Sequence, residues 1–174
     1  MGCRAEESSA SEPHDPMNTL RHEIEEKPPG HHLRFEKNWV GKLYADRHCI
    51  NGGLYLNYVE LVKSAFLPGK YDIITCSCGE SGCAGIFELV TVTHDGDRIV
   101  WHLVEPGPER WFEFSKDQYR SALLESLRWV QAEVPRPENP NDYPFGHTCI
   151  YPWHIDWCIR TLETGIIEET GYEQ

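Results

Sequence analysis

The amino-acid sequence predicts a single α+β domain, in which an antiparallel β-sheet is flanked by helices and preceded by a flexible N-terminal tail. Three observations support this fold class. The length of 174 residues is that of one domain. Hydrophobic residues make up 40% of the chain and charged residues 25%, as in globular proteins. Residues 86–104 carry the clearest β-hairpin pattern, and stretches with helical periodicity lie on both sides of it.

The first 30 residues differ in composition from the rest of the chain. Residues 1–30 are rich in Glu, Ser and Pro and poor in aromatic residues, so we expect a poorly ordered tail. Residues 31–174 then form the single domain, because no internal repeat or second boundary follows. The N-terminus lacks an apolar segment of the signal-peptide type, and no stretch reaches the roughly 18 apolar residues of a membrane helix. We therefore expect no export, no membrane insertion and a cytoplasmic location.

The first elements of the domain are predicted from alternation and helical spacing. Residues 39–50 alternate loosely and predict a strand, which Asn-Gly-Gly at 51–53 ends. A helix follows, and Pro68-Gly69 ends it. Residues 71–76 are rich in β-branched side chains and predict a short strand that ends at Cys76. The helix has one apolar face, made of Leu54, Tyr58, Leu61, Val62 and Ala65.

The hairpin is predicted from two apolar strands around an Asp-Gly dipeptide. Strands at 86–93 and 98–104 flank the turn, and Asp95-Gly96 as the two-residue loop favours a type I′ turn. Counting outward from this loop pairs Thr93 with Arg98 and Val90 with Trp101. We expect one face of the hairpin to be core, formed by Val90, Val92, Ile99, Trp101 and Leu103.

The second half of the chain predicts a strand and two helices. A short strand at 111–114 leads into Ser115-Lys116-Asp117-Gln118, which has the pattern of a capping box at the start of a helix. Residues 135–174 form a C-terminal arm with one short helix from about Trp153 to Glu163. The buried face of the first of these helices is predicted to be Tyr119, Leu123, Leu127 and Val130.

Residues 76–83, CSCGESGC, form what we call the cysteine knuckle. Cys76, Cys78 and Cys83 lie around two glycines that permit unusual backbone angles, so the pattern predicts a structural zinc site. A closed zinc site needs a fourth ligand, and Cys49 or His102 could supply it. The spacing fits a tight turn of small buried thiols equally well, because C-x-C-x4-C is not a standard paired zinc spacing. A redox pair is disfavoured, since a strand and not a helix follows the cysteines.

Other candidate ligands lie in the C-terminal arm. His147 and Cys149 are close in sequence, and His154 and Cys158 are four residues apart on the predicted helix. That helix is strongly apolar, which favours a core thiol at Cys158 over a second metal site. The chain contains no nucleophile elbow, no phosphate-binding glycine loop and no H-E-x-x-H motif. We therefore predict no catalytic residues and no cofactor other than structural zinc.

The net charge of the chain disfavours some classes of partner molecule. The chain has 16 basic and 28 acidic residues, a net charge of −12, which repels phosphate backbones and anionic lipid. We expect neither nucleic acid nor membrane as a partner, and our first hypothesis is a non-enzymatic protein-binding or regulatory domain, for example of the immunity type, with a basic protein partner. The alternative is a metal- or thiol-dependent enzyme that uses the cysteine knuckle with a nearby histidine. The oligomeric state is not predicted.

The middle half of the chain resembles an uncharacterised bacterial protein family. Its members carry a Cys-x(1-2)-Cys-Gly-x-x-Gly-Cys-Gly/Ala segment between strands, which CSCGESGCAGI at 76–86 matches. ELVTV at 88–92, IVW at 99–101 and FSKDQY at 114–119 resemble the elements that follow in the family. NGGLYLNYVELV at 51–62 resembles the upstream helix. The resemblance implies this order of elements and no particular activity.

Overall fold

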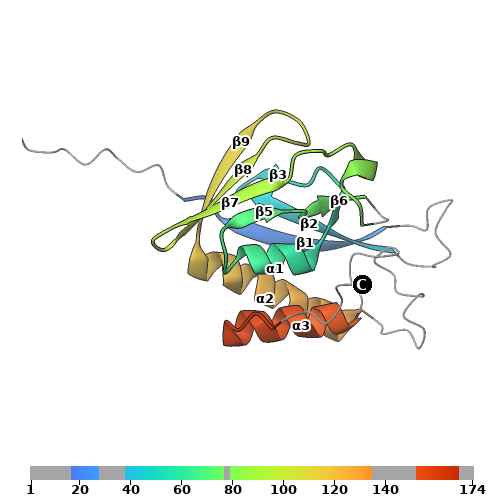
Figure 1. The fold of residues 1–174 in the computed structure, drawn as a ribbon. Helices are drawn as coiled ribbons and strands as arrows, with labels where there is room; N and C mark the ends of the chain where they lie inside the picture. The colour runs from blue at the N-terminus through green and yellow to red at the C-terminus, as the bar shows by residue number, and fades with distance from the viewer. Residues whose placement is uncertain (1–16, 28–37, 77–78, 135–151, 169–174) are drawn as a thin grey trace, which may run out of the picture.

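The computed structural model describes residues 17–27, 38–76, 79–134 and 152–168, and in these parts the strands form a layer over three helices (Figure 1). The helices are α1 (Tyr58–Ser64), α2 (Lys116–Glu133) and α3 (Pro152–Thr164), with a short 3-10 helix η1 (Gly82–Ala84). The strands are β1 (Leu20–Lys27), β2 (Asn38–Ala45), β3 (His48–Cys49), β4 (Tyr55–Leu56), β5 (Gly69–Tyr71), β6 (Ile74–Thr75), β7 (Val90–Asp95), β8 (Arg98–Leu103) and β9 (Arg110–Ser115).

All strand pairs in the described residues are antiparallel. They form a three-stranded sheet β1-β2-β3, a two-stranded sheet β4-β6 and a four-stranded sheet β5-β7-β8-β9. One cluster of buried apolar side chains joins the strands to the helices, and Trp101, Tyr58 and Tyr119 are its largest fully buried members. The predicted single α+β domain is therefore confirmed. No helix in the described parts of the chain is long and apolar enough to cross a membrane.

Strand β1 corrects the predicted extent of the N-terminal tail. Residues 20–27 were expected to belong to the tail, but they pair with β2 over eight residues. Leu20 is buried in the core and Ile24 packs against it, whereas Arg21, Glu23 and Glu25 are exposed. The alternation of a half-buried strand is thus present, in a segment whose charged side chains resemble those of a solvated tail. Residues 1–16 of the predicted tail lie outside the described residues.

The strand predicted at 39–50 is in fact two strands. The chain turns after β2 at Asp46, which has a positive φ of 53° and accepts hydrogen bonds from Thr19 and Asn18. β3 then pairs back onto the end of β2. The predicted strand at 71–76 also divides into β5 and β6, which belong to different sheets.

Helix α1 begins later than its apolar spacing suggests. Asn57 is its N-cap and accepts a hydrogen bond from the backbone N–H of Glu60 at 3.2 Å. Leu54 was expected on the helical face, but it lies before β4, outside the helix. The remaining predicted face is buried as expected at Tyr58, Leu61, Val62 and Ala65.

The hairpin β7-β8 has the predicted buried face in a different register. Asp95 pairs with Arg98 and Val92 with Trp101, so the two-residue loop is Gly96-Asp97 and the pairing is shifted by two residues. Only Gly96 of the two loop residues has a positive φ, the pattern of a type II′ turn. A shift of two residues keeps every side chain on its face, so the predicted core residues Val90, Val92, Ile99, Trp101 and Leu103 are all buried.

Helices α2 and α3 form as predicted; α2 packs against the strand layer, and α3 packs against α1 and α2 on the side away from the strands (Figure 1). Ser115 is the N-cap of α2 and accepts from the Gln118 N–H at 3.5 Å, which is one half of the predicted capping box. The predicted face of α2 is buried at Tyr119, Leu123, Leu127 and Val130. Burial of each such large side chain stabilises the fold by about 1.5–3 kcal/mol, so this face anchors α2 under the sheets.

Candidate functional site

The structure leaves the zinc prediction for the cysteine knuckle untested. Cys83 lies in η1 and is exposed as a free thiol. Cys76 forms a disulfide whose partner is outside the described residues, as is Cys78. A disulfide sulfur is not the thiolate that zinc requires, so the zinc site and this disulfide exclude each other at Cys76. Among the described residues no group of three or more potential ligands is placed to hold a metal ion.

The two residues considered as a fourth ligand have other contacts. Cys49 ends β3, and its thiol donates to the Asn51 side chain at 3.6 Å. His102 lies on the outer face of β8, stacked on Trp111 at 4.0 Å between ring centroids. Its Nε2 is 2.6 Å from Oε1 of Glu109. Both side chains are therefore engaged with residues outside the cysteine knuckle.

Two of the four candidate ligands of the C-terminal arm, His154 and Cys158, lie on the described helix α3. Cys158 is fully buried, its thiol donates to the backbone carbonyl of Tyr58 at 3.6 Å, and burial raises its pKa. Its neighbour His154 is partly buried, and burial lowers its pKa. Cys158 is therefore the core thiol that the apolar helix predicts. His147 and Cys149 lie outside the described residues.

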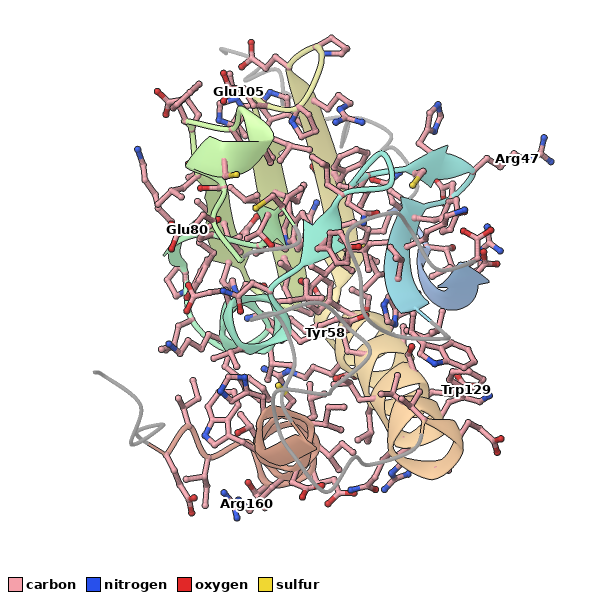
Figure 2. All side chains as sticks on the ribbon, turned by 90° about the vertical axis from the view of Figure 1, so that its right-hand side faces the viewer. Arg47, Tyr58, Glu80, Glu105, Trp129 and Arg160 are labelled. Atoms are coloured by element: carbon pink, nitrogen blue, oxygen red, sulfur yellow. The ribbon has the colours of Figure 1, made fainter. Side chains whose placement is uncertain are left out.

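A groove lies between β1 and α2, and we call it the β1–α2 groove. It encloses about 800 Å³. Figure 2 views the molecule from the side where β1 lies above α2, with Tyr58 labelled toward the centre and Trp129 beside α2. The lining residues are Leu20, Arg21, His22, Glu23, Ile24, Glu25, Lys42, Gln118, Ser121, Ala122, Glu125, Ser126 and Trp129.

One wall of the groove is a strand edge. Among the described strands β1 pairs only with β2, and Gln118 at the start of α2 bonds to the backbone on its other edge. Gln118 caps this edge at Leu20, because its side-chain Oε1 accepts from the Leu20 N–H at 3.1 Å and its Nε2 donates to the Leu20 carbonyl at 2.6 Å. The amide of Gln118 thus imitates a neighbouring strand. Backbone groups alternate in direction along a strand, so those of His22 and Ile24 also point toward the groove.

A hydrogen-bonded chain of three side chains begins in the groove, where His22 and Ser126 line it, and ends at buried Tyr58. His22 Nδ1 contacts the hydroxyl of Ser126 on α2, and His22 Nε2 lies 2.7 Å from the hydroxyl of Tyr58 on α1. The rings of His22 and Tyr58 also meet edge to face. Burial lowers the pKa of His22 to about 3, so the imidazole is neutral at physiological pH. This chain ties β1 to both helices.

Gly41 on β2 makes room for this contact. A Cβ at position 41 would lie 2.0 Å from the Tyr58 hydroxyl and 2.8 Å from His22 Nε2. The backbone here is held from the other side by buried Asn51, whose amide donates to the Gly41 carbonyl at 2.9 Å and accepts from the Leu43 N–H at 3.0 Å. β2 is therefore fixed close beneath the pair of His22 and Tyr58.

The contact of Ser126 with His22 has the residue types of a nucleophile and its base, but the surroundings do not suit that chemistry. A histidine whose pKa is about 3 is a weak base, and its second nitrogen meets the hydroxyl of Tyr58 where catalytic triads place a carboxylate. Ser126 lies inside α2, where backbone N–H groups are used by the helix and do not form an oxyanion hole. The arrangement suits positioning better than catalysis.

The charges along the groove are largely paired. Arg21 is bonded to Glu23, and Lys42 is bonded to Glu25 at 2.6 Å, a hydrogen bond that raises the pKa of Lys42. Glu125 on α2 is exposed, and none of the described residues pairs with it. The groove therefore presents one uncompensated carboxylate.

An aromatic side chain lies one helical turn beyond Glu125. Trp129 is 42% exposed and packs edge to face against Trp39 of β2, with ring centroids 5.6 Å apart. The four-residue spacing puts Glu125 and Trp129 on one face of α2. The groove thus presents a carboxylate and an indole on one face of α2.

Sequence reasoning missed this site because its central strand was assigned to the tail. The detectable signal was the alternation in residues 20–25, where Leu20, His22 and Ile24 alternate with charged side chains. The contacts from Tyr58 and Ser126 to His22 span 36 and 104 residues of sequence, and spacing within one element cannot show them.

Comparisons of the chain with models of protein families, with curated proteins and with solved structures give no match. The resemblance of the cysteine knuckle to an uncharacterised bacterial family stays a prediction. Function is therefore inferred from the geometry of the β1–α2 groove.

Proposed function

We propose that this chain is a non-enzymatic protein-binding domain, which captures an extended segment of a basic partner protein by strand addition to β1. The observation that carries the proposal is the edge of β1 beside the open groove, with which no other described strand pairs. Main-chain hydrogen bonds to a sheet edge supply affinity in this mode of recognition, and neighbouring side chains supply specificity. Such a contact is a means by which a regulatory or immunity-type domain occupies its target.

The dimensions of the groove support an extended ligand. Residues 20–25 of β1 line it, and the four residues from His22 to Glu25 span about 13 Å of strand. Gln118 already fills the edge position at Leu20, so a ligand strand would pair from His22 onward. The net charge of −12 favours a basic partner and accelerates its capture at low ionic strength.

The test uses peptides selected by wild-type protein from a randomised ten-residue library displayed on phage. We expect selected peptides to slow hydrogen exchange at the amides of His22 and Ile24, which point toward the groove. The amides of Arg21 and Glu23 point toward β2 and should change little. Ile24→Pro removes one of the outward N–H donors and should abolish binding. Ile24→Ala keeps that donor and should retain binding.

Thermal melts of both variants show whether the fold survives. Exchange protection confined to another surface would refute strand addition at β1, as would equal affinities of folded Ile24→Pro and Ile24→Ala. A stable homodimer that is lost in Ile24→Pro would show that the edge binds a second copy of this chain, and that result would also refute the proposal.

A further inference from the structure

We infer that the captured strand carries a lysine or arginine two residues away from a large apolar side chain, both turned toward α2. This inference rests on the proposed strand addition and specifies its ligand. The basic residue would meet Glu125, and the apolar residue would meet Trp129.

The charges in the groove favour a basic residue in the ligand strand. The cations Arg21 and Lys42 already have carboxylate partners, so a ligand carboxylate would find no free cation among the lining residues described. Glu125 is exposed and unpaired among the described residues, so a ligand cation gains a partner without displacing another. The contact is solvent-exposed, and it contributes to selectivity more than to total affinity.

The spacing of Glu125 and Trp129 along α2 favours an apolar residue two positions from the basic residue of the ligand. Four residues of helix separate Glu125 from Trp129, a rise of about 6 Å along α2. Side chains on one face of a strand repeat every two residues, about 6.7 Å apart. The two repeats match closely, so adjacent ligand side chains on the α2 side reach adjacent groups on the helix. Trp129, 42% exposed and supported by Trp39, offers a rigid indole surface for an apolar or aromatic side chain.

The direction of the ligand decides the order of the pair. α2 runs from Gln118 beside Leu20 to Trp129 beside Trp39, whose strand partner is Glu26, so α2 and β1 run in the same direction. An antiparallel ligand would therefore present its apolar residue first and its basic residue second. A parallel ligand would present them in the reverse order, so the selected order identifies the strand direction.

The test compares peptides selected from the same phage library by wild type, Glu125→Lys and Glu133→Lys. Glu133→Lys makes the same charge change on α2 outside the groove, so it controls for long-range electrostatics. We expect wild type and Glu133→Lys to select the basic and apolar pair, and Glu125→Lys to select an acidic residue at the basic position. A lysine peptide chosen by wild type should bind Glu125→Lys about three- to tenfold more weakly, with a smaller difference in 0.5 M salt.

The possible results separate this inference from the proposed function. Peptides that protect the amides of His22 and Ile24, but lack the pair or bind wild type and Glu125→Lys equally, would overturn the inference and leave strand addition intact. Failure to select any peptide that protects these amides would overturn both. Loss of the apolar preference in Trp129→Ala, with the basic preference kept, would confirm the role assigned to Trp129.

Discussion

Replacing Gly41 with alanine tests whether the contact of His22 with Tyr58 organises the groove. The new methyl group would lie 2.0 Å from the Tyr58 hydroxyl, 2.8 Å from His22 Nε2 and 3.1 Å from Tyr58 Cζ. Carbon atoms do not approach other atoms so closely, so either the hydrogen bond breaks or β2 moves. Movement of β2 is opposed by Asn51, which holds the Gly41 carbonyl from the other side.

The expected loss of stability follows from the hydrogen bond between His22 and Tyr58 that the methyl group breaks. Breaking the hydrogen bond separates the Tyr58 hydroxyl from His22 Nε2. Each buried polar group that is left without a partner costs about 1–3 kcal/mol of stability. We expect Gly41→Ala to lower the free energy of unfolding by about 3 kcal/mol. In a chain of 174 residues this corresponds to a melting temperature about 6–12 °C lower.

Thermal and urea unfolding measure this effect, and Gly82→Ala is the matched control. Gly82 has no atom within 4 Å of its added Cβ and no positive φ, so that variant should melt close to wild type. Adding Tyr58→Phe to Gly41→Ala removes the atom that lies nearest the methyl group, so the double variant should lose less stability than the two single changes added together. A Gly41→Ala protein that melts within about 1 °C of wild type would refute the reasoning.

Two further predictions concern titration and thiol chemistry. Because the folded pKa of His22 is about 3 and the unfolded value about 6.5, only the unfolded chain takes up the proton as pH falls below 6.5. Wild type should therefore lose about 2 kcal/mol more stability than His22→Asn in urea melts compared between pH 7 and pH 5, and equal losses would contradict the prediction. In native protein purified without reductant, alkylation should label Cys83 rapidly, Cys158 only after unfolding and Cys76 only after reduction. One zinc ion per chain after purification with reductant, lost in Cys78→Ser, would instead support the predicted metal site.

The elements that the sequence predicted well are those fixed by local contacts. Helix α2 follows from a cap at Ser115 and an apolar face that repeats within one element. The buried face of the hairpin was predicted because strand alternation has a period of two, and its register was wrong for the same reason: a shift of two residues leaves every side chain on its face. Periodicity could not decide whether Gly96 stands first or second in the loop.

The groove could not be predicted because long-range contacts create it. Gln118 was expected to complete a capping box, and its side chain instead bonds to Leu20, which is 98 residues away in sequence. His22 was expected to lie in a tail, and it contacts side chains from two helices. Arg21, Glu23 and Glu25 lie on the exposed side of β1, and composition alone does not distinguish such an edge strand from a tail.

The same contacts explain why an edge strand with little apolar surface could act as a template for a ligand. Gln118 holds the backbone of β1 at Leu20, and Ser126 and Tyr58 hold the side chain of His22, so α1 and α2 fix the position of the strand before any ligand binds. A strand that is already ordered need not lose conformational entropy on binding, and only the ligand does. Backbone groups at His22 and Ile24 remain directed at the groove, because the anchors use the backbone only at Leu20 and the side chain at His22. In the proposed strand addition, these contacts would contribute by holding β1 in the extended conformation that an added strand requires.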